Sequence, residues 1–561
     1  MLKHIKRNLM AVAAGSILIG SVNAEVINEQ YTGNYAEQGK GGRGLIVDIV
    51  PSTESEFGNA VLAQWFTFRD GQPLWLLAVG AIDQNTDTAE LEFLELEGGV
   101  FGPEYQEADS STNAWGTGTL TFNSCSSLTL EYDGLDGSGT QNLIPVTQGE
   151  ECVVKEAFSG CPSFASAGPL DGTCVIGGEF DSDITLSNEI TWLIQGQFII
   201  NDGASVTIEP NTEIIGGTLG DTDTLVVRPG GQIFAEGTAN NPIVMRGPDA
   251  LTRAEWGGVV INGRAPINGC AEGVDPCTAQ GEGNSGTYGG NDPHDNSGVL
   301  RYVIVSNAGR QFSEENELNG IAFQGVGDGT TVEYIQVHLN EDDGVEFFGG
   351  TVNARYLVLT GIGDDSLDWT QGWQGKVQYV IAKQYNDNGD QGIEADNNGD
   401  ANDSLPRAKP ILANMTYIGQ SNTDIGILLR EGTGAEIANS IVTGFGEFCL
   451  DIDNESTFLN EDNLSIVNSV VGGCAETFSE DAEDLFSVAE WFFSDPNNVE
   501  ANPNLNNYML NAGSPAIGIG AVPFQDDFFD NVDYAGAVSP TGADWTTGWT
   551  VGLDRNAPLG Q

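Results

Sequence analysis

The chain has 561 residues, with 81 Asp or Glu against 20 Lys or Arg, and a formal net charge of −61 at pH 7. Such a surface repels polyanions, so nucleic acid is excluded as a partner, whereas a saline medium or bound divalent cations would screen the charge. After the first 24 residues the only histidines are His294 and His338, which excludes any metal site built from three or more histidines.

Residues 1–24 have the pattern of a secretory signal peptide. Three basic residues precede an apolar stretch, residues 9–19, and small residues at 22–24 end the segment. A basic region, a short apolar core and a small-residue cleavage site are typical of export signals. The sequence therefore predicts a secreted, extracellular or periplasmic, protein whose mature chain begins at Glu25. No later stretch is long and apolar enough to span a bilayer.

Residues 25–155 are expected to form a separate, small antiparallel β domain. The stretch QWFTFRDGQPLWLLAVG, residues 64–80, reads as a strand, a turn at Asp70 and Gly71, and a second strand. Alternating segments on both sides of it supply further strands. The large side chains of the hairpin are expected to form the core: Trp65, Phe66, Trp75 and Leu77.

Residues 156–180 are rich in Cys, Gly and Ser and are interpreted as a linker. The whole chain contains eight cysteines, and an even number in an exported protein indicates disulfides. Local pairing is the simplest arrangement, although eight cysteines allow many others. The expected pairs are Cys125 with Cys152, Cys161 with Cys174, Cys270 with Cys277, and Cys449 with Cys474.

Residues 181–510 repeat themselves. One recurring strand reads NGIAFQG, DGVEFFG, DSLDWTQ and QGIEADN, beginning at residues 319, 343, 365 and 391. A second reads LRYVIVS, VEYIQVH, ARYLVLT and VQYVIAK, beginning at residues 300, 332, 354 and 377, and most repeats are 22 to 29 residues apart. Self-similarity of this kind indicates a solenoid, and short strands in each repeat predict coils of parallel strands.

The second strand also carries one aligned position, occupied by Tyr302, Tyr334, Tyr356, Tyr379, Asn414, Asn439 and Asn468. Identical side chains stack when coils lie directly above one another, so we expect tyrosine rings to stack and asparagines to hydrogen-bond up the column at a bend. With these ladders the segment resembles the right-handed parallel β-helix of the pectate-lyase-like fold. The run WGGVVINGRAP also resembles the first coils of exported bacterial β-helix proteins. The resemblance implies an all-β fold class. The fold alone does not indicate an activity, since lyases, hydrolases, adhesins and phage tailspikes share it.

Two segments depart from the repeat. Residues 263–296 are polar and rich in Gly, so they are expected to form an insertion on the surface of the solenoid. Residues 475–493 can contain one helix, and residues 511–561 are expected to form a C-terminal cap or tail. A cap is expected because the open end of a solenoid exposes apolar core and strand edges.

Three successive repeats place a carboxylate at the same strand position: Glu346, Asp368 and Glu394. Strand alternation turns these side chains outward on coils about 4.8 Å apart. Neighbouring carboxylates at that spacing repel by roughly 1–3 kcal/mol per pair, so a counter-charge is expected. Calcium fits because it takes several oxygen ligands and needs neither His nor Cys, while the alternative is that Asp merely favours turns. The predicted calcium ligands are Asp343, Glu346, Asp365, Asp368, Asp390, Glu394 and Asp396.

The resemblance to pectate lyases also implies a catalytic alternative. Those enzymes hold calcium with outward acids on successive coils and use an arginine as the base. Arg430 lies in register with Asp396 and would match, or would act as a counter-ion for Glu431 or Asp396. Hydrolases of this fold use clustered Asp residues as acid and base, but the signature motifs of both enzyme groups are absent. If the protein is an enzyme, the catalytic residues would be Asp364, Asp365, Asp368 and Arg430.

We therefore expect an exported, calcium-stabilised β-helix protein that binds a polysaccharide or a cell-surface glycan without catalysis. The alternative is a calcium-dependent polysaccharide lyase or glycoside hydrolase that uses the stacked acids. Trp373, Tyr385 and Tyr288 are the aromatic residues that we expect could stack on sugar rings.

Overall fold

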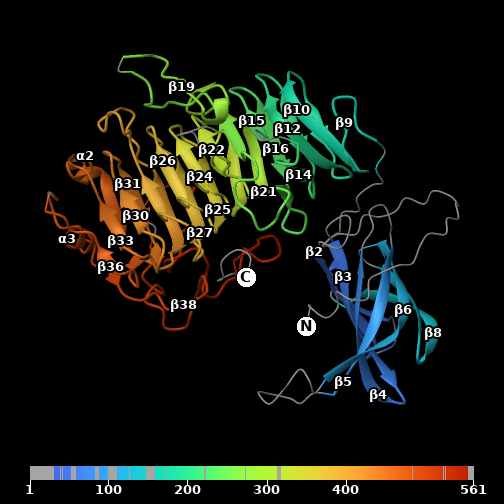
Figure 1. Ribbon diagram of the computed structural model, residues 1–561. Helices are drawn as coiled ribbons and strands as arrows, with labels where there is room; N and C mark the ends of the chain where they lie inside the picture. Colours follow the sequence, from blue (N-terminus) through green and yellow to red (C-terminus); the bar gives the residue numbers. More distant parts are fainter. Residues whose placement is uncertain are drawn as a thin grey trace. The chain divides into compact units, whose positions relative to one another are not determined.

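The structure is a computed structural model and describes residues 31–37, 40, 42–51, 59–81, 88–98, 110–124, 127–146, 158, 160–170, 172–219, 223–271, 273–312, 318–482, 484–521, 524 and 526–553. The chain divides into two compact units, with the change between residues 149 and 158 (Figure 1). The predicted signal peptide and the Cys125–Cys152 pair lie outside the described residues. Within the described part of the chain, no helix has the length and apolarity needed to cross a bilayer.

The first unit is an antiparallel barrel of eight strands. Its strands are β1 (Gly33–Glu37), β2 (Gly44–Pro51), β3 (Asn59–Arg69), β4 (Gln72–Ala81), β5 (Thr88–Gly98), β6 (Ser110–Ser124), β7 (Ser127–Gly134) and β8 (Gly137–Pro145). The predicted hairpin is β3–β4, with its turn at Asp70 and Gly71. Trp65, Phe93 and Trp115 meet in the core with ring centroids 5.4 to 5.9 Å apart.

The predicted core of this hairpin is correct only for Trp65. Phe66 is 39% exposed, Trp75 is 48% exposed, and Leu77 is half-buried. Successive side chains of a strand point to opposite faces, so the neighbours Trp65 and Phe66 cannot both face the core. Phe66 and Trp75 lie opposite each other on the outer face of the barrel.

The second unit is a parallel β-helix, so the predicted fold class is confirmed. Three parallel sheets wind along it. Sheet 1 contains the second halves of β10 (Thr173–Phe180) and β12 (Thr191–Ile200), then β15 (Thr224–Val227), β18 (Val259–Asn262), β22 (Ile321–Gln324), β24 (Val345–Phe348), β26 (Leu367–Thr370), β28 (Ile393–Ala395), β30 (Ile425–Leu429), β33 (Phe448–Ile452) and β36 (Glu476–Phe478).

Sheet 2 contains β11 (Ile184–Leu186), β13 (Ser205–Ile208), β16 (Gln232–Glu236), the first halves of β21 (Gly298–Ser306), β23 (Thr331–His338), β25 (Asn353–Thr360), β27 (Lys376–Lys383) and β29 (Ile411–Ile418), then β31 (Ala435–Ala438) and β34 (Leu464–Val467). Sheet 3 contains the first halves of β10 and β12, then β14 (Glu213–Ile215), β17 (Ile243–Arg246), the second halves of β21, β23, β25, β27 and β29, and β32 (Ile441–Thr443), β35 (Val470–Val471) and β37 (Val499–Glu500).

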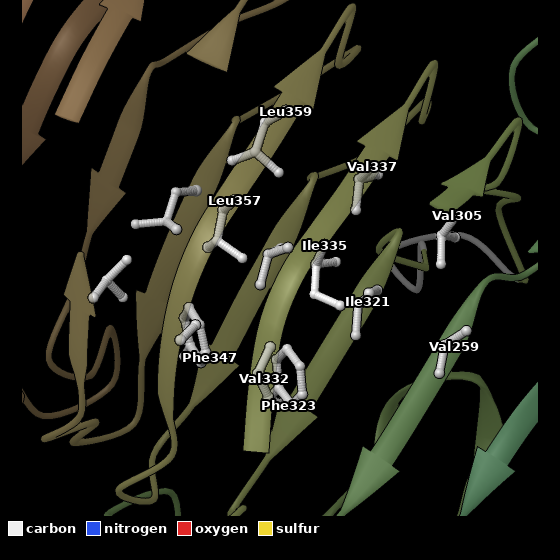
Figure 2. Close-up of a cluster of buried hydrophobic side chains, with 14 of the residues drawn as sticks. Val259, Val305, Ile321, Phe323, Val332, Ile335, Val337, Phe347, Leu357 and Leu359 are labelled. Atoms are coloured by element: carbon white, nitrogen blue, oxygen red, sulfur yellow. The ribbon is translucent and has the colours of Figure 1, made fainter. Parts of the chain in front are cut away.

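The core of the solenoid consists of like side chains stacked from coil to coil. Phe323 stacks on Phe347 with ring centroids 5.3 Å apart, and Phe347 stacks on Trp373 at 4.0 Å. Figure 2 shows part of this core, in which Ile335 and Leu357 lie on neighbouring coils. Each coil thus buries apolar surface on the next, which is the main stabilising term of such a fold.

The predicted ladder marks the bend between sheets 2 and 3. Tyr302, Tyr334, Tyr356 and Tyr379 have φ values of 49° to 68°, and consecutive rings stack with centroids 4.3 to 4.9 Å apart. The left-handed region is unfavourable for a bulky residue, so stacking must offset a backbone cost at each coil. The predicted stacking of tyrosines is confirmed.

The asparagines of the ladder also have positive φ, and they bond to the C-terminal segment. An Asn-to-Asn bond up the column is present where Asn497 Nδ2 donates to Asn468 Oδ1 at 2.9 Å. The Nδ2 of Asn414 donates to the backbone oxygens of Tyr534 and Gly536, both at 3.2 Å, and Asn468 Nδ2 donates to Ala521 O at 2.8 Å. We call residues 502–521, 524 and 526–553 the strap. It lies along the side of the solenoid rather than over the last coil, where the sequence suggested a cap.

The ends of the solenoid differ from the predicted boundaries. Residues 173–180, assigned to the linker, form β10, the first strand of the solenoid, and β9 (Ser166–Ala167) pairs antiparallel with it. At the other end the predicted helix is α3 (Val488–Phe492), and Phe492 packs on Phe478 of the last sheet 1 strand. Three of the predicted disulfides are present: Cys161–Cys174, Cys270–Cys277 and Cys449–Cys474.

Candidate functional site

The three carboxylates predicted from the repeat lie side by side on sheet 1. Glu346 of β24 is opposite Asp368 of β26, and Asp368 is opposite Glu394 of β28. The flanking Val345 and Phe347 belong to the core, so the carboxylates point away from it. They are nevertheless covered, because Glu346 and Asp368 are each only 8% exposed.

Asp343, Glu346 and Asp368 form a group whose members are all buried, which we call the carboxylate cluster. Each contributes an oxygen within 4.8 Å of the oxygens of the other two. Burial and neighbouring negative charges raise the pKa of all three carboxyls well above the usual range. In the described part of the chain, Asp368 Oδ1 has no hydrogen-bond partner. Calcium fits this donor set, because it binds carboxylate oxygens and would satisfy the unpartnered one.

The turn aspartates use one oxygen to join successive coils. Asp343 Oδ1 accepts the backbone N–H of Asp365 at 3.1 Å, and Asp365 Oδ1 accepts the N–H of Gln391 at 2.7 Å. This is the turn role that the sequence left open. A carboxylate has a second oxygen, however, and Asp364, Asp365 and Asp390 also have oxygens within 4.8 Å of one another. Burial and the hydrogen bond and charge of a neighbouring aspartate raise the pKa of Asp390 to about 7.

Glu394 and Asp396 are held by an arginine. Arg430 donates from Nη2 to Glu394 at 2.6 Å and from Nε to Asp396 at 2.9 Å. Burial disfavours the charge of Arg430, but its bonds and charge interactions with Asp396 and Glu394 outweigh burial and raise its pKa. An arginine in this state is a counter-ion and is poorly suited to accept a proton. Burial raises the pKa of Glu394 to about 7, although Arg430 acts to lower it.

The insertion, residues 263–296, adds a carboxylate that the sequence analysis missed. Glu282 lies in the short helix η3 (Glu282–Asn284), and Asn319 Nδ2 donates both to Glu282 Oε2 at 3.0 Å and to Glu346 Oε2 at 2.6 Å. Burial and the charge of Asp342 raise the pKa of Glu282 to about 8. The only sequence signal was an acidic residue among glycines, and the repeat could not place it because it lies outside the repeat.

The outward column that contains the acids is apolar in earlier coils. Ile199, Val226, Val260 and Ala322 occupy the four preceding positions of the same column. They form a cluster with residues of the insertion, including Ile267 and Tyr288. The insertion therefore covers the apolar half of the column and ends beside the acidic half.

The aromatic residues proposed for sugar stacking are not accessible. Trp373, Tyr385 and Tyr288 are buried, with exposed fractions of 0 to 2%. Trp373 belongs to the interior stack, while Tyr288, on the inner side of the insertion, packs against sheet 1 and donates its hydroxyl to Gln371 Oε1 at 2.7 Å. The proposal of sugar stacking at these residues was therefore wrong, because coil-to-coil packing and the insertion cover their rings.

The comparisons with known proteins concern the solenoid. The family described as "Pectate-lyase like beta helix domain" matches residues 178–550, well over half of the chain. The chain belongs to this family. This pectate-lyase-like β-helix protein is also similar to the catalytic domain of a GH87 alpha-1,3-glucanase in complex with tetrasaccharides. The identity is 11%, over 85% of this chain and 99% of that one, with a TM-score of 0.19, which is too low to support an argument. No curated protein matches the chain.

Proposed function

We propose that the protein is an exported, calcium-stabilised β-helix protein that binds a neutral polysaccharide without cleaving it. The carboxylate cluster carries this proposal, because three buried carboxylates and an unpartnered oxygen call for a cation. Disulfides persist in oxidising compartments, so the three described ones support export. The acidity of the chain disfavours an anionic polysaccharide.

The state of the candidate catalytic residues supports binding over catalysis. Asp365 and Asp368 are 4% and 8% exposed, which leaves little surface for contact with a glycosidic oxygen. Asp365 also accepts a backbone hydrogen bond, and Arg430 is engaged by two carboxylates. Asp364, the fourth candidate, is half-buried.

The calcium site is tested by calorimetry and thermal unfolding of the mature protein in chelator and in calcium. Calcium should bind and raise the melting temperature by mass action. Asp368→Asn should reduce both responses, because it removes a charge from the centre of the cluster. Asp462→Asn, the same change at an exposed position of the same unit, is the control. An unchanged melting temperature together with undetectable calcium binding would refute the site.

The exposed aromatic residues of the barrel supply the polysaccharide surface in this proposal. Phe66, Phe68 and Trp75, which we call the aromatic strip, are 39 to 48% exposed. Phe66 lies opposite Trp75, and on its other side lies Gly44, which has no side chain to cover the ring. Rings presented this way can stack on the C–H faces of neutral sugars, whereas isolated apolar side chains would need no explanation.

Binding is tested with insoluble and soluble polysaccharides, both neutral and anionic. The Phe66→Ala/Trp75→Ala variant should lose affinity for the neutral ligand while keeping its melting temperature, because both side chains are exposed. Leu135→Ala, which trims an apolar side chain that is 74% exposed, is the control. The same incubations should release neither reducing nor unsaturated ends. Release of either kind of end would favour the lyase or hydrolase alternative. Unchanged affinity of the double variant would refute the role of the aromatic strip in binding.

A further inference from the structure

A second group of buried oxygens lies beneath the insertion. Asn262 Oδ1 and Gln324 Oε1 come from neighbouring strands of sheet 1, and Ser285 Oγ comes from the insertion. They converge beside Gly281, where a Cβ would collide with Gln324 Oε1 and Ser285 Oγ and would lie 3.2 Å from Asn262 Oδ1. Only glycine can occupy position 281 without displacing these oxygens.

These three oxygens are acceptors whose needs the described residues do not meet. Asn262, Ser285 and Gln324 are fully buried, and none of the three oxygens has a hydrogen-bond partner among the described residues. Water cannot reach a fully buried oxygen freely, so leaving it unpaired opposes folding. Three such atoms at one point indicate that a bound species satisfies them together.

The neighbouring bonds fix which end of each amide faces this point. Asn262 Nδ2 donates to the backbone oxygen of Ser285 at 3.3 Å, and Gln324 Nε2 donates to Glu282 Oε2 at 3.4 Å. Turning the Gln324 amide over would bring its oxygen against the Glu282 carboxylate. The point beside Gly281 therefore faces three oxygens, while the Glu282 carboxylate lies at the nitrogen end of the Gln324 amide.

We propose a second calcium site here, which clamps the insertion onto the solenoid. Its protein ligands are Asn262 Oδ1, Gln324 Oε1 and Ser285 Oγ. Calcium suits amide and hydroxyl oxygens in a flexible arrangement and accepts water as a further ligand. Two ligands belong to sheet 1 and one to the insertion, so the ion joins segments that the Cys270–Cys277 disulfide, internal to the insertion, does not connect. This site goes beyond the carboxylate cluster and shares no ligand with it.

The first test is the stoichiometry of calcium binding to the full mature protein by calorimetry. The wild type should bind one ion at each site. Asp368→Asn should lose or weaken the ion at the carboxylate cluster alone. Asn262→Leu/Gln324→Met, which keeps the shape of both side chains, should lose the other ion alone. Ser285→Ala removes a single ligand atom and disturbs the fold least. It should weaken the binding of the same ion. Gln280→Met, at an exposed amide next to Gly281, is the control.

The second test is limited proteolysis, which separates a clamp from a distant ion. Chelator should speed cleavage within residues 263–296 of the wild type, and Ser285→Ala should show faster cleavage than Gln280→Met even in calcium. A single ion that Asp368→Asn abolishes would overturn this second site and leave the proposed function intact. An absence of calcium binding would overturn both. If a water molecule rather than calcium occupies this point, Ser285→Ala and the double variant should show the calcium stoichiometry and the cleavage rate of the wild type. That result would overturn the clamp.

Discussion

One outward column of sheet 1 is apolar over the four coils from β12 to β22, which we call the apolar half, and acidic over the next three, which we call the acidic half. Ile199, Val226 and Val260 lie in the same register as Glu346 and Asp368, on other strands of the same parallel sheet. Both halves are buried, but the apolar half is stabilised by removal of its surface from water, whereas the acidic half accumulates charge. The backbone thus sets the position of a side chain. The chemistry of that side chain decides whether the stability of the coil depends on pH and on bound ions.

The largest expected effect comes from moving a carboxylate into the apolar half. Val260 is 1% exposed and packs beneath the insertion, so Val260→Asp would bury a charge among apolar side chains. We expect a loss of about 3–5 kcal/mol in the free energy of unfolding, measured with denaturant. Val260→Ala, which only removes methyl groups, should lose less free energy of unfolding. An equal loss in the two variants would show that the buried charge is not the cause.

The acidic half should make the calcium-free protein less stable as pH rises. Burial, the largest cause, raises the pKa of Asp390 and Glu394 to about 7, whereas these groups titrate near pH 4 when unfolded. Between about pH 4 and pH 7 the folded state binds more protons, so the free energy of unfolding falls as pH increases through that window and then levels off. Denaturation in chelator at several pH values measures this slope. Calcium should reduce it, and a stability that rises with pH would contradict the argument.

A smaller effect is expected when the repulsion itself is removed. Glu346→Gln/Asp368→Asn keeps the shapes of both side chains and deletes two adjacent charges. In chelator this variant should gain about 1–2 kcal/mol over the wild type, since neighbouring carboxylates repel by roughly that amount. In calcium the gain should vanish, because the variant has lost ligands. Asp462→Asn should change neither value, and a loss of stability in chelator would show that the carboxylates serve another purpose.

The repeated positions explain how much of the fold could be predicted. Tyr334 and Tyr356 recur at the spacing of one coil. From that spacing the stacking of the tyrosines, the register of Glu346 with Asp368, and the outward direction of these two carboxylates could be predicted. Exposure could not be predicted in the same way, because it depends on what covers a strand. Trp373 was placed at the surface, but it fills the interior.

The parts that lie outside the repeat were not predictable. Glu282 reaches sheet 1 because the insertion folds back over it, and no periodic pattern describes that path. The strap likewise supplies partners for the ladder asparagines that the repeat does not predict, because backbone groups far along the chain bond to Asn414. At Arg430 the sequence gave the correct register with Asp396 but not the second bond to Glu394.

The strap has a consequence for the order of assembly. In a solenoid each coil touches only its neighbours, so coils can form one after another along the chain. The strap instead bonds to coils far apart: Ala521 N donates to Asn439 Oδ1 at 3.0 Å, Asp530 N to Gln378 Oε1 at 2.8 Å, and Val551 N to Gln336 Oε1 at 2.9 Å. It follows those coils in the chain and can dock only when they exist. Docking therefore joins independently formed coils into one cooperative unit as the final event of folding.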